Sequence, residues 1–228
     1  MAFFNYSRKF MITNKQLLVI FLMCLIYGTA NAWHTRWHRQ PIHPPVVVDP
    51  NQVGFVGCSM TMGIMNGLIN HGSTLGWQPA PDYGGGGVYQ WAKSMQSGYW
   101  TEFKNALAKQ PAKRILWQLC SLDSTKSQET YENALKIADN IRALIPDVEL
   151  YVSAQPSYNP TSHVCSIAGF TGPSRMSELA AELVANGVAI DGPVFGPLDY
   201  PSETLNDGCH PNTSGENLFA DQFLNYFE

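Results

Sequence analysis

The feature that most constrains the fold is an alternation of short apolar runs with longer segments of helical periodicity. Residues 52–57, 113–119 and 148–154 are short apolar runs of strand length, whereas residues 128–145 and 174–186 carry apolar side chains at helical spacing. Strands that alternate with helices form a parallel sheet with helices on its faces. The sequence therefore predicts an α/β fold whose parallel sheet is covered on both faces.

The rest of the chain extends the same pattern. Gly63 and Gly67 lower the helical propensity of one expected helix, and a second helix is expected to break near Gly98. Thr213 or Ser214 is expected to cap the last helix. These further elements are helices over 60–70, 88–109 and 213–227, a loop over 72–87, and a last strand over 188–190, extended at most to residue 195.

The beginning of the chain has the order of a secretory signal peptide. Three basic residues precede an apolar run over 17–27, and Ala30-Asn31-Ala32 is a small-residue cleavage site. The run is short for a membrane span, which needs roughly 20 apolar residues. We therefore expect a cleaved leader over residues 1–32 and a secreted or cell-envelope protein; the alternative is an uncleaved leader that anchors the chain in a membrane.

The domain organisation follows from this leader. Residues 33–50 contain His34, His38 and His43, but prolines oppose a helix that would bring the three together on a metal. We expect this segment to be a tethering extension, and residues 51–228 to form one domain with a full core. The full chain has a formal net charge of −4, and removing the basic leader makes it more acidic. Acidity without a basic cluster argues against nucleic acid as a partner.

Four cysteines remain outside the leader. An even number in an exported chain permits two disulfides with three connectivities, and four buried thiols are the alternative. We favour Cys165 with Cys209, because both lie in loop-like sequence late in the chain. Cys58 with Cys120 is then the second pair, at the ends of two strands. Their spacing matches no zinc site, so neither a metal nor a cofactor is expected.

Polar residues follow the predicted strands where a parallel α/β sheet binds its ligands, beyond the carboxyl ends. Ser59 follows the first strand, residues 121–123 follow the next, and Asp207 and His210 precede the last helix. A serine hydroxyl needs a base and the base needs an orienting group. The residues therefore predict Ser59 as nucleophile, His210 as base and Asp207 as orienter. Each residue alone also has an ordinary structural explanation, and only their combination and order point to catalysis.

The two ends of this arrangement resemble the GDSL/SGNH hydrolases. Residues 56–59, Val-Gly-Cys-Ser, resemble the first family block, and residues 207–212, Asp-Gly-Cys-His-Pro-Asn, resemble the last. The resemblance implies a three-layer α/β/α sandwich with a flavodoxin-like sheet. It also implies a serine esterase or acyl hydrolase that cleaves carboxylic esters through an acyl-serine intermediate. An oxyanion glycine is implied at Gly86 or Gly87, within the run Gly84–Gly87, beside the backbone N–H of Ser59.

Two features depart from the family pattern. Cys58 stands where the family has an acid beside the nucleophile, and Leu122 stands where it has an oxyanion asparagine. Losing one such donor typically costs about 10²–10³ in turnover, and Gln118 or Ser121 is the expected substitute. The α/β-hydrolases are the nearest rival family, but their Gly-x-Ser-x-Gly motif is not matched, because Thr61 occupies its last position.

The expected partner is a small-molecule or polysaccharide ester, so the reaction removes acyl groups from a polysaccharide or a lipid. Four aromatic residues flank the glycine run and suit stacking on sugar rings, although core packing explains them equally well: Trp77, Tyr83, Trp91 and Trp100. The alternative function is a secreted, non-catalytic glycan-binding protein on the same scaffold.

Overall fold

The structure, a computed structural model, describes residues 49–77, 86–159 and 165–227. The expected signal peptide, the extension up to residue 48, and Tyr83, Gly84 and Gly85 lie outside these residues. Within the described ranges no helix is both long enough and apolar enough to span a membrane.

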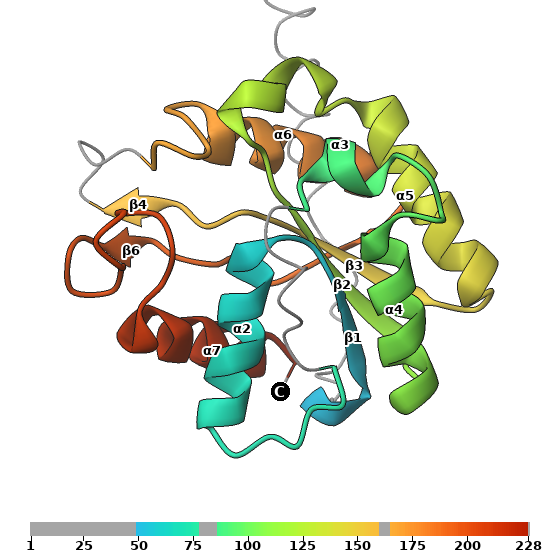
Figure 1. Cartoon of the computed structure of the whole chain (residues 1–228), viewed down its shortest axis with the longest axis horizontal. Coiled ribbons are helices and arrows are strands. Elements are labelled where there is room, and N and C mark those ends of the chain that lie inside the picture. The colour runs from blue at the N-terminus through green and yellow to red at the C-terminus, as the bar shows by residue number, and fades with distance from the viewer. Residues whose placement is uncertain (1–48, 78–85, 160–164, 228) are drawn as a thin grey trace, which may run out of the picture. The chain divides into compact units, whose positions relative to one another are not determined.

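A parallel four-stranded sheet in the order β1-β2-β3-β5 forms the centre of the domain (Figure 1). Its strands are β1 (Val53–Val56), β2 (Arg114–Leu119), β3 (Glu149–Ala154) and β5 (Ile190–Asp191). The predicted α/β fold with a parallel sheet is confirmed. A flavodoxin-like sheet carries a further strand beyond the first, whereas β1 pairs only with β2 within the described residues.

The last strand is shorter and later than the sequence predicts. The backbone N–H of Val188 bonds to the carbonyl of Leu183 at 2.9 Å and closes the preceding helix, so residue 188 is not free to join the sheet. The strand ends at Asp191, two residues before Pro193, which has no N–H to donate to a ladder.

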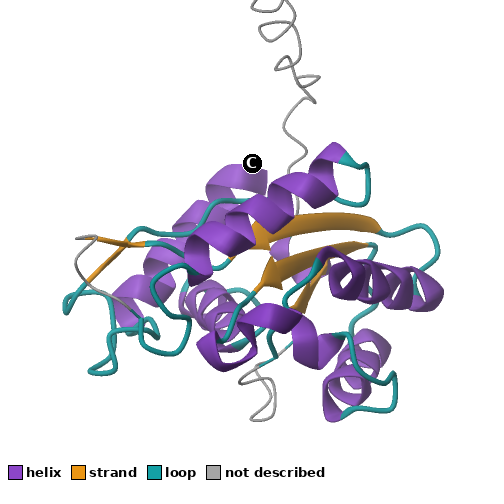
Figure 2. Cartoon of the chain, turned by 90° about the horizontal axis from the view of Figure 1, so that it is seen from above, coloured by secondary structure: helices purple, strands orange, loops and turns teal. Residues whose placement is uncertain are grey.

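Helices cover both faces of the sheet (Figure 2). Phe55 of β1 packs against Phe223 of α7 (Thr213–Phe227), with ring centroids 6.0 Å apart. A Cβ at the neighbouring Gly54 would instead meet Trp77, which packs at 5.1 Å on Phe103 of α4 (Gly98–Lys109). Figure 1 shows α2 (Ser59–Asn70) beside α7, and α5 (Tyr131–Leu144) and α6 (Gly172–Ala185) with α4 on the other side.

The glycines of α2 lie at its contact with α7. A Cβ on Gly63 would come within 2.5 Å of the Pro211 ring, and one on Gly67 would collide with the backbone of Glu216. The residues that weaken the helix in isolation therefore let the two helices pack closely. The cap of α7 corrects the sequence prediction: the Asn212 side chain, not that of Thr213 or Ser214, accepts the backbone N–H groups of Ser214 and Gly215 at 2.9 and 3.3 Å.

The segment after the glycine run breaks where expected. The chain forms α3 (Val88–Trp91) and then α4, which starts at Gly98. Trp77, Trp91 and Trp100 are at most 1% exposed. They belong to the core, so the sugar-stacking interpretation is wrong for these three.

Short elements escaped the sequence analysis. They are the 3-10 helices η1 (Pro50–Gln52) and η3 (Asp123–Gln128), and a small parallel sheet of β4 (Tyr158–Asn159) and β6 (Leu198–Asp199). Two-residue strands are too short to show alternation, which explains why the pattern does not reveal them.

Both expected disulfides are present. Cys58 pairs with Cys120, with Cα atoms 6.2 Å apart, and Cys165 pairs with Cys209, with Cα atoms 4.7 Å apart. The first bond joins the turn after β1 to the end of β2. The second joins the segment before α6 to the loop before α7.

Candidate functional site

Ser59 is placed by a tight turn between β1 and α2. A Cβ on Gly57 would collide with the Thr61 hydroxyl, so the chain needs a glycine there. That hydroxyl accepts the N–H of Cys58 at 3.1 Å and donates to the Gln118 side-chain oxygen at 2.8 Å. Ser59 is the first residue of α2. The described residues give its backbone N–H no hydrogen-bond partner, so this group points out of the helix N-terminus unpaired.

Asp207 and His210 are held by a compact loop before α7. One Asp207 carboxylate oxygen accepts the backbone N–H groups of Cys209 and His210 at 2.9 and 3.0 Å. The other lies 2.5 Å from Nδ1 of His210. The Tyr158 hydroxyl donates to the Cys209 carbonyl at 3.0 Å. These bonds hold the backbone of His210 and one nitrogen of its imidazole ring.

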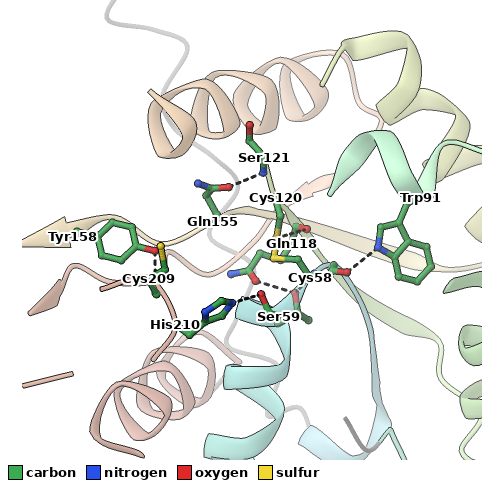
Figure 3. The surroundings of a disulfide bond; sticks show 12 residues. Cys58, Ser59, Trp91, Gln118, Cys120, Ser121, Gln155, Tyr158, Cys209 and His210 are labelled. Atoms are coloured by element: carbon green, nitrogen blue, oxygen red, sulfur yellow. Dashed lines mark hydrogen bonds between the residues drawn. A yellow bond between two sulfur atoms is a disulfide. The ribbon is translucent and has the colours of Figure 1, made fainter. Parts of the chain in front are cut away.

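The structure brings the three predicted residues together. His210 Nε2 lies 2.7 Å from Oγ of Ser59, across 151 positions of sequence (Figure 3). A carboxylate can only accept a hydrogen bond, so Asp207 holds the proton on Nδ1. Nε2 is then an acceptor for the Ser59 hydroxyl. This is the order of groups that moves a proton from a serine to a histidine.

The environment keeps the Asp207 carboxylate ionised. Partial burial opposes its charge, but the hydrogen bonds from the His210 ring and from two backbone amides outweigh this and lower the pKa of Asp207 below its ordinary value. For Tyr158, burial and the nearby Asp207 charge both raise the pKa, so its hydroxyl stays protonated as a donor.

A cavity of about 270 Å³ opens beside Ser59 and His210. Its wall is mainly apolar and includes Met60, Leu122, Ile167, Ala168 and all four disulfide cysteines. Sequence reasoning did not find Tyr158, Ile167 or Ala168 as wall residues, because nothing in their local pattern marks them. The paired cysteines carried the only signal that residues near 165 approach His210.

On the other side of the cavity, Ser121 is already engaged. Its backbone N–H donates to the side-chain oxygen of Gln155 at 2.7 Å, and its hydroxyl accepts from Arg175 at 2.6 Å. The Leu122 side chain lines the cavity where the family resemblance places a donor. Gln118 is buried and does not line the cavity. Its amide nitrogen has no partner among the described residues.

The predicted oxyanion glycines pack against the residues that follow β1 and β2. They are not part of the cavity wall. A Cβ on Gly86 would come within 2.8 Å of the Gly57 carbonyl, and one on Gly87 within 2.9 Å of the Cys120 carbonyl. Both glycines are buried, and neither lines the cavity. Their role as oxyanion donors stays a prediction.

A buried carboxylate that the sequence did not single out supports this side of the site. Glu129 accepts the backbone N–H of Tyr89 at 3.1 Å and the Thr125 hydroxyl at 2.8 Å. Burial raises the pKa of Glu129, against the lowering effect of these bonds and of the Arg175 charge. Glu129 thus ties α3 to η3.

In the described part of the chain, no cluster of three or more His, Cys, Asp or Glu side chains is placed to hold a metal ion. His34, His38 and His43 lie outside the described residues.

No protein-family model matches the sequence, and no curated protein matches it. The resemblance to the GDSL/SGNH hydrolases therefore rests on the motif residues themselves.

Proposed function

We propose that this chain is a secreted serine hydrolase that cleaves carboxylic esters, with the residue arrangement of the GDSL/SGNH type. The observation that carries the proposal is the unbroken chain of contacts from Ser59 through His210 to Asp207, at 2.7 and 2.5 Å. The spacing of Asp207 three residues before His210, and the parallel α/β sheet, both support this arrangement. The SGNH form of the fold is part of the proposal.

In the first half of the reaction Oγ of Ser59 attacks the ester carbonyl carbon as its proton passes to Nε2 of His210. Asp207 stabilises the imidazolium that forms. The carbonyl oxygen becomes an oxyanion, and the backbone N–H of Ser59, which the described residues leave unpaired at the N-terminus of α2, is the first donor to it. The family resemblance implies a second donor at Gly86 or Gly87, although neither glycine lines the cavity beside Ser59.

The tetrahedral intermediate then collapses. The carbon–oxygen bond to the alcohol breaks, and the leaving oxygen takes the proton from His210. Water attacks the acyl-serine, with His210 accepting its proton and returning one to Oγ of Ser59. The products are a carboxylic acid and an alcohol, and the chain returns to its starting state.

Two disulfides support export, because such bonds persist in oxidising compartments. We therefore place the reaction outside the cell or in its envelope, on an acylated polysaccharide or a lipid.

The second candidate is a non-catalytic glycan-binding protein on the same scaffold. It is favoured by one observation: Leu122 occupies the expected donor position while the Ser121 N–H is bonded to Gln155. A site that stabilises the oxyanion too weakly would bind an ester without turning it over.

Turnover of p-nitrophenyl acetate and labelling by a fluorophosphonate probe separate the two candidates. We expect both in the disulfide-bonded protein, and neither in Ser59→Ala. The matched control is Ser127→Ala, because Ser127 is exposed on η3 and its loss should leave both signals intact. Absence of both signals in a folded wild-type protein would overturn the esterase proposal and favour the binding protein.

A further inference from the structure

A second, larger cavity adjoins the one beside Ser59. It measures about 570 Å³ and lies between β3, α6 and the segment after β5. The two cavities share three wall residues: Gln155, Tyr158 and Cys165. The larger one does not touch Ser59 or His210.

One loop forms the boundary between the cavities. In residues 165–171, Cys165 borders both, Ile167 borders the smaller, and Phe170 borders the larger. The loop is fixed at several points, because Cys165 is bonded to Cys209 and the Ile167 carbonyl accepts the backbone N–H of Asp123 at 2.8 Å. A further bond of 2.9 Å runs from the N–H of Gly169 to the Cys165 carbonyl.

We propose that this loop, residues 165–171, divides the substrate. The smaller cavity takes a short apolar acyl chain, and the larger cavity takes a polyhydroxylated alcohol of the sugar type. The inference rests on the proposed esterase function and names the substrate class for that site.

The acyl group belongs in the smaller cavity because it stays covalently attached to Ser59 after the alcohol has left. Of the two cavities, the smaller one contacts Ser59. Met60, Leu122 and Ile167 give it apolar walls that suit a hydrocarbon chain. Its volume lies just below the roughly 300–1,000 Å³ of common small-molecule sites, so the chain it accepts is short.

The leaving oxygen lies beside His210, from which it takes a proton, and the rest of the alcohol extends across the shared wall into the larger cavity. The residue before His210 is Cys209, whose disulfide partner Cys165 lies on the wall common to both cavities. Phe170 lines this cavity and is 78% exposed, so its ring is accessible to a ligand. Ser177 and Asp191 add a hydroxyl and a carboxylate to the lining. A ring face beside hydrogen-bonding groups suits the apolar face and the hydroxyls of a sugar.

The acyl half is tested with p-nitrophenyl acetate, butyrate and octanoate, which share one alcohol. We expect kcat/KM to fall at least about tenfold from butyrate to octanoate, which corresponds to about 1.4 kcal/mol. Ile167→Ala should reduce that fall, and Ile167→Trp should move it to shorter chains. Ile167 is 42% exposed, so both variants should fold. A profile that is the same in all three proteins overturns the acyl assignment.

The alcohol half is tested with ethyl acetate and glucose pentaacetate, which share one acyl group, by measuring released acetate. Phe170→Ala should raise KM for the glucose ester several-fold more than KM for ethyl acetate. An equal change for both esters, or none, overturns the alcohol assignment. Loss of all ester turnover in the wild type would instead remove the proposed function, and this inference with it.

Discussion

The two sides of Ser59 are built differently. On the His210 side, Asp207 and the imidazole bond to each other, and the open ring nitrogen points at the Ser59 hydroxyl. On the Ser121 side, the polar groups bond among themselves, and an apolar side chain faces the cavity. In Figure 3 the Cys58–Cys120 disulfide lies between the two sides. Proton transfer and charge stabilisation are therefore specified by separate parts of the chain.

Each side also has a carboxylate, and the two differ in exposure and in the direction of their pKa shift. Asp207 is partly exposed, and hydrogen bonds lower its pKa. Glu129 is buried, and burial raises its pKa. The first supports a positive charge on a neighbouring ring, whereas the second holds two backbone segments together. A carboxylate near a site therefore has a structural or a chemical role according to its exposure and its hydrogen-bond donors.

The largest expected effect comes from removing the base. His210→Ala should lower kcat for p-nitrophenyl acetate by about 10⁴–10⁶, because the serine loses its proton acceptor. Circular dichroism should match the wild type, since His210 is only half-buried. A loss below tenfold would mean that another group accepts the proton, and the two-sided description of the site would fail.

The second largest effect is expected from loss of the Cys165–Cys209 disulfide beside His210. Replacing Cys165 and Cys209 together by serine opens a link across 44 positions, and loop-closure entropy predicts a loss of about 4 kcal/mol in the free energy of unfolding. Denaturant titration measures it. The Cys58/Cys120 double variant, with a separation of 62, is the matched control for stability. An unchanged denaturation midpoint for the Cys165/Cys209 variant would show that the loop is held without the bond.

A donor introduced on the Ser121 side tests whether charge stabilisation limits the rate. Leu122→Asn places a carboxamide in the cavity wall, and we expect kcat to rise about tenfold, part of the 10²–10³ that one good donor provides. Leu122→Met, an apolar change of similar volume, is the control and should leave kcat near the wild-type value. If Leu122→Asn does not raise kcat above the wild-type value, the missing-donor interpretation is wrong.

The smallest effect is in the pH dependence of stability. A raised pKa means that folded Glu129 binds its proton more tightly than the unfolded chain does, so the wild type loses stability as pH rises above the ordinary value of 4.5. Glu129→Gln should lack this loss. Asp207 has the opposite sign: its stabilising effect is present above 3.8 and disappears as pH falls through its lowered pKa. Unfolding titrations from pH 3 to 7 on wild type, Glu129→Gln and Asp207→Asn check both trends.

The sequence predicted what local patterns encode. The apolar runs of β1, β2 and β3 and the helical stripe of α5 are long enough to show their periods, and Ser59, Asp207 and His210 carry recognisable spacing. The Ser121 side could not be predicted, because it depends on distant partners. Gln155 and Arg175 reach Ser121 across 34 and 54 positions, and neither has a marked local pattern. Likewise Asn212 became the cap of α7 through side-chain geometry that the residue order leaves open.

The glycine contact between α2 and α7 has a consequence for when the site exists. The helix that begins with Ser59 and the helix that follows His210 pack closely at Gly63 and Gly67, where an added Cβ would meet the Pro211 ring or the backbone of Glu216. The Ser59 hydroxyl and the His210 imidazole therefore meet only after α7 has docked on α2. A nascent or truncated chain lacks the contact, so chemical competence arrives together with the completed domain.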